Sequence, residues 1–190
     1  MNNIFSEIVK DKSGNLWIAA FNEGLSMIDL NKPLIQNYSF PSIREKTGFI
    51  TNIKNIYEDG DGDLWIDQNR WGVGIFNPGT NKLQLYTDIP SLKNVPNLRN
   101  ISCIISVPLL NEIWLGSEYY PEIYRVKKEK DRIELLGTLN LSNYADNPGF
   151  PRIFYEDSKH NLWVVTTKGI LVKPEKEKNL QDTKFPSMDI

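Results

Sequence analysis

Three aspartates alternate along residues 57–67, where the chain reads YEDGDGDLWID, and oxygen ligands at every second position are typical of a calcium loop. Counted from Asp59, the carboxylates of Asp61 and Asp63 fall at the third and fifth positions of such a loop. The sixth position should be glycine but is Leu64, and the twelfth should be glutamate but is Arg70. The flanking segments are β-branched and aromatic, so the stretch is predicted to be a hairpin turn.

Other residues capable of catalysis or metal binding are few. His160 is the single histidine and falls in a predicted turn, where we expect a solvated side chain. Cys103 is the single cysteine and lies in the apolar run ISCIISV, where it is expected to be a small core residue. The run GVGIFNPG lacks the third glycine of a nucleotide loop and is predicted to be a strand followed by a turn. We therefore predict no catalytic residue, no metal site and no cofactor.

The hairpin predicted around Asp59 recurs along the chain as part of a repeat. Each copy has an apolar run, a polar turn and a short run that contains tryptophan. The four tryptophans are separated by 48, 49 and 49 residues, a period within the range of propeller blades. They are Trp17, Trp65, Trp114 and Trp163.

Each repeat has room for four short strands. A third apolar run follows the tryptophan, and a fourth is clearest in LQLYTDI at residues 83–89, while no amphipathic helix is evident. The sequence predicts an all-β, β-propeller-type array of four consecutive four-stranded antiparallel blades, belonging to a larger propeller. Its single domain of residues 1–190 divides into approximate blades of 1–48, 49–97, 98–146 and 147–190.

The tryptophan-containing run is predicted to be the second strand of each blade. Because side chains alternate along a strand, Leu64 and Ile66 should point to one face of the blade and Trp65 to the other. Blades are covered on both faces by their neighbours, so we expect all four tryptophans to be mostly buried.

Composition excludes several classes of protein. The chain has 190 residues, 40% of them hydrophobic and 24% charged, which is enough for a core without disulfides. Its net charge of −2 and the lack of a basic stripe argue against nucleic acid, and no apolar run reaches the length of a membrane span. The first strand begins by residue 4 with no signal peptide before it, and the tail starts no fifth repeat. We expect a segment of a longer repeat array.

The phrase DKSGNLWI resembles the regulator-propeller repeat in the periplasmic sensor domains of hybrid two-component systems, many of which detect glycans. Copies one, two and four carry the phrase, whereas the third has Pro108 in place of aspartate and Glu112 before its tryptophan. The resemblance implies a periplasmic sensor. The small number of candidate catalytic residues separately predicts that the chain is not an enzyme. It concerns the structural repeat and carries little information about the ligand.

The loop between the second and third strands differs most between copies: AAFNE, DQNRW, GSEYYP and VTTK. In neighbouring propeller blades such loops gather on one side, so Arg70 and Trp71 are expected near Glu118, Tyr119 and Tyr120. Aromatic faces beside charged groups suit a sugar ring, which predicts an oligosaccharide or a similar polar ligand. In the alternative interpretation, Trp71 and one tyrosine only cap a blade edge.

Three function classes follow from these observations. The first is a ligand-recognition segment of a sensor propeller, and the second is a protein-interaction or structural segment. The third is a propeller-type lyase, which would need a general acid or base beside a metal-binding carboxylate. Uncovered apolar faces on the terminal blades also predict a homo-oligomer, in which two copies could form one eight-bladed ring.

Overall fold

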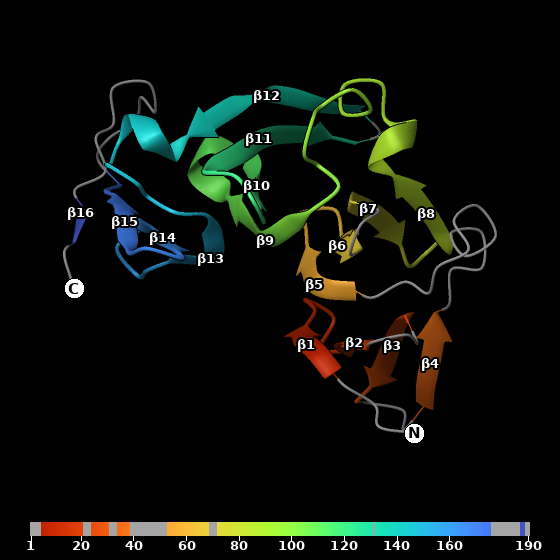
Figure 1. Cartoon of the computed structure of the whole chain (residues 1–190). Coiled ribbons are helices and arrows are strands. Elements are labelled where there is room, and N and C mark those ends of the chain that lie inside the picture. Colours follow the sequence, from red (N-terminus) through yellow and green to blue (C-terminus); the bar gives the residue numbers. More distant parts are fainter. Residues whose placement is uncertain are drawn as a thin grey trace. The chain divides into compact units, whose positions relative to one another are not determined.

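A computed structural model describes residues 5–20, 24–30, 34–38, 53–68, 72–130, 132–175 and 187–188. The described residues form four antiparallel sheets, and each sheet contains four strands in the order of the sequence (Figure 1). The predicted all-β, β-propeller-type array of four consecutive blades is therefore confirmed. The chain divides into two compact units, Met1–Asn100 and Ile101–Ile190, each holding two blades.

The first unit contains blades 1 and 2. The strands of blade 1 are β1 (Phe5–Lys10), β2 (Leu16–Ala20), β3 (Gly24–Asp29) and β4 (Leu34–Tyr38). Those of blade 2 are β5 (Ile53–Glu58), β6 (Leu64–Gln68), β7 (Gly72–Asn77) and β8 (Lys82–Leu85). The fourth strand predicted over residues 83–89 ends at Leu85, because Tyr86–Asp88 form the 3-10 helix η1 and bury Tyr86.

The second unit contains blades 3 and 4. Blade 3 consists of β9 (Ile101–Val107), the 3-10 helix η2 (Pro108–Leu110), β10 (Glu112–Ser117), β11 (Glu122–Glu129) and β12 (Arg132–Asn140). The 3-10 helix η3 (Leu141–Asn143) leads to blade 4, whose strands are β13 (Pro151–Glu156), β14 (Leu162–Thr166), β15 (Ile170–Lys173) and β16 (Ser187–Met188).

The aspartate-rich stretch at residues 59–63 is the turn between β5 and β6, as predicted. Oδ1 of Asp59 accepts hydrogen bonds from the backbone nitrogens of Asp61 at 2.9 Å and Asp63 at 3.1 Å. Its other oxygen, Oδ2, accepts the indole N–H of Trp65 at 2.9 Å. The carboxylate thus holds the turn and the following strand together, a use of aspartate common in turns.

The same bond from the indole to a carboxylate recurs in the other hairpins. Trp17 donates to Asp11 and Trp163 donates to Asp157, each at 2.9 Å. In the third hairpin, where Pro108 replaces the aspartate, Trp114 donates to Glu112 at 2.8 Å. We call this bond the indole clasp. It orients each tryptophan through a residue of its own hairpin.

The two faces of each blade have different compositions. The tryptophan face carries the indole, and the opposite, leucine face carries the residues on either side of it in sequence. In the first unit, Trp17 of blade 1 packs in one buried cluster with Leu64 and Ile66 of blade 2. In the second unit, Trp114 of blade 3 packs with Leu162 and Val164 of blade 4. Within each unit, a tryptophan face meets the leucine face of the following blade.

All four tryptophans lie on the second strand of a blade, which confirms their predicted placement. Trp17, Trp65 and Trp114 are buried, as expected. Trp163 is only half-buried, on the tryptophan face of blade 4, so the prediction that all four tryptophans are mostly buried is confirmed for three of them. Cys103 is a free, buried cysteine, and the run GVGIFNPG is β7 followed by a turn, both as predicted.

Candidate functional site

The loop between β10 and β11 presents two of the tyrosines predicted to bind ligand. Tyr119 is 52% exposed and Tyr120 is 45% exposed, although large aromatic side chains usually pack into the core. The loop is fixed at its end, because the carbonyl of Pro121 accepts the backbone N–H of Leu141 at 2.7 Å and Leu141 is fully buried. Two aromatic rings and the carboxylate of Glu118 are therefore carried by an anchored segment.

The corresponding loop of blade 4 is closed on itself. Oγ1 of Thr166 accepts the backbone N–H groups of Lys168 and Gly169, each at 3.1 Å, and donates to the carbonyl of Gly169 at 3.0 Å. The sequence difference between these loops thus corresponds to a structural difference: blade 3 presents aromatic side chains where blade 4 has a tight polar turn.

Arg70 and Trp71, the other two residues of the predicted site, lie outside the described residues. They belong to the first unit of the chain, whereas Glu118, Tyr119 and Tyr120 belong to the second. That the five side chains share one site stays a prediction.

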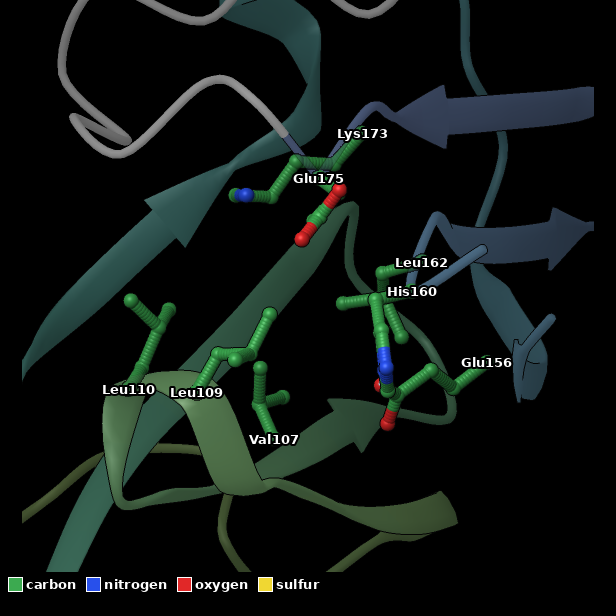
Figure 2. Close-up of a pocket in the computed structure, with 8 residues that line it drawn as sticks. All are labelled: Val107, Leu109, Leu110, Glu156, His160, Leu162, Lys173 and Glu175. Atoms are coloured by element: carbon green, nitrogen blue, oxygen red, sulfur yellow. The ribbon is translucent and has the colours of Figure 1, made fainter. Parts of the chain in front are cut away.

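A pocket of about 400 Å³ lies between blades 3 and 4, at the end of β10 away from the loop of Tyr119 and Tyr120. Figure 2 shows aliphatic side chains from the end of β9 and from η2 facing Glu156 and His160 of blade 4. The lining residues are Val107, Leu109, Leu110, Glu156, His160, Leu162, Lys173 and Glu175. Sequence reasoning did not identify this pocket, because its two walls come from different repeats.

His160 occupies the predicted turn but is not merely solvated. Its backbone is left-handed with φ of 59°, and its Nδ1 lies 2.6 Å from Oε1 of Glu156. Hydrogen bonding to Glu156 raises the pKa of the imidazole despite partial desolvation, and the negative charges of Glu175 and Asp157 act in the same direction. The carboxylates of Glu156, Glu175 and Asp157 therefore favour the protonated form of His160 at this wall of the pocket.

Two further charged residues lie in this part of blade 4: Asp157 belongs to the same hairpin as His160, and Lys173 lines the pocket. The carboxylate of Asp157 has a pKa well below its ordinary value, because Asn161 and Trp163 donate hydrogen bonds to it. Lys173 is buried, and its ammonium lies 3.4 Å from the carbonyl of Pro174. In Figure 2 this ammonium points away from the pair formed by His160 and Glu156.

The described part of the chain contains no group of three or more His, Cys, Asp or Glu side chains arranged to hold a metal ion. Nor does that part contain a helix with the length and apolarity of a membrane span.

Comparison with solved structures identifies proteins of the same fold. The chain is similar to the extracellular domain of a protein described as the hybrid two-component system BT3049 of B. thetaiotaomicron, with a TM-score of 0.71 and 17% identity over 96% of this chain and 22% of that one. The extracellular domain of BT4673 of B. thetaiotaomicron matches with a TM-score of 0.62 and 17% identity, over 93% of this chain and 21% of that one. A streptogramin B lyase matches with a TM-score of 0.68 and 16% identity, over 98% of this chain and 54% of that one.

No family model and no curated protein matches the chain. The chain spans about a fifth of the two extracellular domains. The fold implied by the regulator-propeller resemblance is confirmed by these neighbours, which include the extracellular domains of BT3049 and BT4673 as well as a lyase.

Proposed function

We propose that this chain is a ligand-recognition segment of a periplasmic sensor propeller of the two-component regulator type, and that it binds without catalysing a reaction. One observation carries the proposal: four tryptophan-centred blades form a fold shared with extracellular domains of two-component systems. The resemblance of the repeat DKSGNLWI to the regulator-propeller repeat supports the same assignment. Further blades of a longer protein would then complete the propeller.

The tyrosine loop, Glu118–Pro121, is the proposed binding surface, and the ligand is an oligosaccharide or a similar polar molecule. The exposed rings of Tyr119 and Tyr120 can stack on the C–H face of a sugar, and Glu118 can accept hydrogen bonds from its hydroxyls. Arg70 and Trp71 are proposed to contribute a cation and a third aromatic surface.

An oligosaccharide array followed by calorimetry tests this proposal. Once a binding sugar is identified, Tyr119→Ala together with Tyr120→Ala should weaken its binding by at least tenfold, since aromatic stacking contributes about 1 kcal/mol or more per ring. Leu136→Ala is the control, because Leu136 is also an exposed hydrophobic residue of blade 3 but lies on β12, outside the loop. If the double variant bound the sugar as tightly as the parent chain, the loop would not be the site. Arg70→Ala and Trp71→Ala test the other half of the predicted set.

The terminal blade faces favour a second role, in self-association. On the leucine face of blade 1, Ile8 is 59% exposed, and on the tryptophan face of blade 4, Tyr155 is 60% exposed. The aliphatic and aromatic residues of these faces are Ile8, Leu16, Ile18, Ile28 and Ile35 in blade 1, and Ile153, Tyr155, Trp163, Val165, Ile170 and Val172 in blade 4. Inside each unit, a tryptophan face packs on a leucine face. The tryptophan face of blade 4 in one copy should therefore pack on the leucine face of blade 1 in a second copy.

Sedimentation velocity over a range of concentrations tests this association. The isolated chain should form a dimer or larger species, and Ile8→Lys or Tyr155→Lys should shift it to monomer, because each places a charge in an apolar interface. Leu136→Lys is the control, since Leu136 is an exposed hydrophobic residue on the edge strand β12. A monomer at all concentrations, with the four blades closed into one ring, would overturn the second role.

A further inference from the structure

The segment of residues 86–100, which leads from β8 to β9, is long for a connection between strands and is held in place by its own backbone (Figure 1). The N–H groups of Leu92 and Lys93 both donate to the carbonyl of Ile89, at 3.0 Å and 2.9 Å. Leu92 and Leu98 are fully buried. The polar residues between these two leucines are therefore carried on an anchored loop.

A pocket of about 280 Å³ opens on this segment and lies wholly within the first unit. Two cationic side chains line it, Lys93 and Arg99, and neither has an ion pair or a side-chain hydrogen bond within the described part of the chain. Asp88 is the single acidic residue of the segment and does not line the pocket. The amide side chains that line it are those of Asn94, Asn97 and Asn100. The pocket therefore offers two positive charges to a ligand without a carboxylate in its lining.

Tyr86 adds a buried aromatic ring with an available hydroxyl to the same pocket. Only 4% of this residue is exposed, and its ring packs so closely on Gly72 that a Cβ there would lie 2.5 Å from Cε1 of Tyr86. The hydroxyl makes no hydrogen bond with the described residues, yet it is not sealed from solvent. Buried tyrosines usually have a partner for this group, and here the pocket is where a partner can bind.

These groups suit an oxyanion carried on a hydroxylated body. A guanidinium can donate two parallel hydrogen bonds to a carboxylate or sulfate, and an ammonium adds a compact positive charge. Asparagine amides both donate and accept hydrogen bonds, as sugar hydroxyls do. The volume of the pocket is far larger than a single water molecule or small ion requires. A ligand that uses all of these groups is therefore larger than an inorganic ion.

We propose that this pocket binds an acidic sugar, with the anionic group held by Lys93 and Arg99 and the hydroxyls held by the asparagine amides and Tyr86. Uronic acids and sulfated sugars share this chemistry. The site is distinct from the tyrosine loop, which belongs to the second unit, so it does not depend on the binding surface proposed there.

Calorimetric titration of the 190-residue chain with D-glucuronate and with D-glucose 6-sulfate tests the proposal. At least one of these acidic sugars should bind, with an affinity that falls as salt is added, because the two cations are exposed and therefore screened. D-Glucose and sodium sulfate should each bind at least about tenfold more weakly, since one lacks the charge and the other the hydroxyls. The tighter of the two acidic sugars identifies the anionic group. Equal binding of glucose, equal binding of sulfate, or no binding of either acidic sugar would overturn the proposal.

Three substitutions assign the binding groups. Arg99→Gln and Lys93→Gln should each weaken binding of the acidic sugar at least about tenfold, because each removes a charge-assisted hydrogen bond. Tyr86→Phe keeps the ring that packs on Gly72 and should weaken binding about threefold to tenfold through loss of the hydroxyl. Lys82→Gln is the control, since Lys82 is an exposed lysine on β8 that does not line the pocket. Unchanged affinity in both Arg99→Gln and Lys93→Gln would contradict the proposed site.

Amide NMR of the labelled chain locates the bound sugar and separates this site from the tyrosine loop. Saturable shifts are expected at Lys93, Asn97 and Asn100. Tyr119→Ala together with Tyr120→Ala should leave these shifts and the affinity unchanged, whichever ligand the tyrosine loop binds. Shifts confined to the tyrosine loop, or loss of acidic-sugar binding in that double variant with its fold retained by circular dichroism, would overturn the assignment to this pocket.

Discussion

Trp17 and Trp163 occupy the same position in the first and last blades, yet their surroundings differ. Both donate the indole N–H to an aspartate six residues earlier, at the same distance of 2.9 Å. Trp17 is 2% exposed because blade 2 covers it, whereas Trp163 is half-buried on the tryptophan face of blade 4. The hairpin therefore fixes the orientation of the indole, and a following blade provides its burial.

Among the variants considered, replacing these two tryptophans with alanine should give the largest difference in the free energy of unfolding between the two sites. Trp17→Ala should lower the free energy of unfolding by about 3–5 kcal/mol, the range for a large aromatic side chain deleted from a core. Trp163→Ala should cost only about 1–2 kcal/mol, because less apolar surface is withdrawn from water there. Urea unfolding followed by circular dichroism measures both values. Equal losses would mean that the clasp, rather than burial, dominates.

The third hairpin tests whether the clasp itself stabilises the fold. Glu112 accepts from Trp114 and forms a two-point ion pair with Arg125, at 2.8 Å and 2.6 Å. Glu112→Ala should cost about 3 kcal/mol, because it leaves a partly buried guanidinium and a buried indole N–H without their acceptor. The control is Glu134→Ala, which removes an exposed ion pair with Arg132 and should cost about 0–1 kcal/mol. Similar losses in the two variants would contradict the assigned role.

The residue two places after the tryptophan differs between blade 3, which blade 4 covers, and blade 4, which is terminal: it is Gly116 in blade 3 and Val165 in blade 4. A Cβ at Gly116 would lie 2.5 Å from Sγ of Cys103 and 2.8 Å from Cβ of Pro151. Gly116→Ala should therefore cost about 2 kcal/mol through overpacking against Cys103 of its own blade and Pro151 of blade 4. Blade 4 itself carries the larger Val165 at this position, and Val165→Ala should cost about 1 kcal/mol. Thermal unfolding of the two variants distinguishes overpacking from ordinary loss of volume.

The smallest expected effect is a pH dependence from the carboxylates of the first and fourth clasps. Burial raises the pKa of Asp11, but hydrogen bonds from Trp17 and Asn15 outweigh it, and bonds from Asn161 and Trp163 lower the pKa of Asp157. Because both folded values are lowered, the stabilisation is present above the unfolded pKa of about 3.9 and is lost as pH falls through the folded pKa.

Melting temperatures measured between about pH 2 and pH 6 can detect this loss. The parent chain should lose more stability on acidification than Asp11→Asn or Asp157→Asn, since asparagine retains an oxygen acceptor but does not ionise. Parallel pH profiles for parent and variants would show that these carboxylates have ordinary pKa values. Asp88→Asn, outside the hairpins in η1, is a suitable control.

Local pattern was sufficient to predict the blades. The spacing of the tryptophans, the polar turns and the alternation of Leu64, Trp65 and Ile66 together identify the second strands and their faces. The partner of each indole was not predicted, although aspartate precedes tryptophan by six residues in three copies. The 3-10 helix at Tyr86 was also missed, because burial of that ring overrides the strand-like composition of LQLYTDI.

The candidate sites were harder to predict for a physical reason. The tyrosine loop was recognised because its residues are adjacent in sequence, and the structure confirms that Tyr119 and Tyr120 are exposed. The pocket joins Leu109 to Glu156 across two blades, and contacts at such separations are set by packing rather than by local propensity.

The indole clasp has a consequence for how the chain folds. Its two partners are separated by only two to six residues, so a hairpin can close before any second blade has formed. Folding of such a molecule is expected to begin at several turns in parallel and to spread between adjacent repeats, as in other linear arrays. Each duplicated repeat contains the hairpin at which its own folding can start. An array of this kind can therefore lengthen during evolution without sequence changes in the repeats already present.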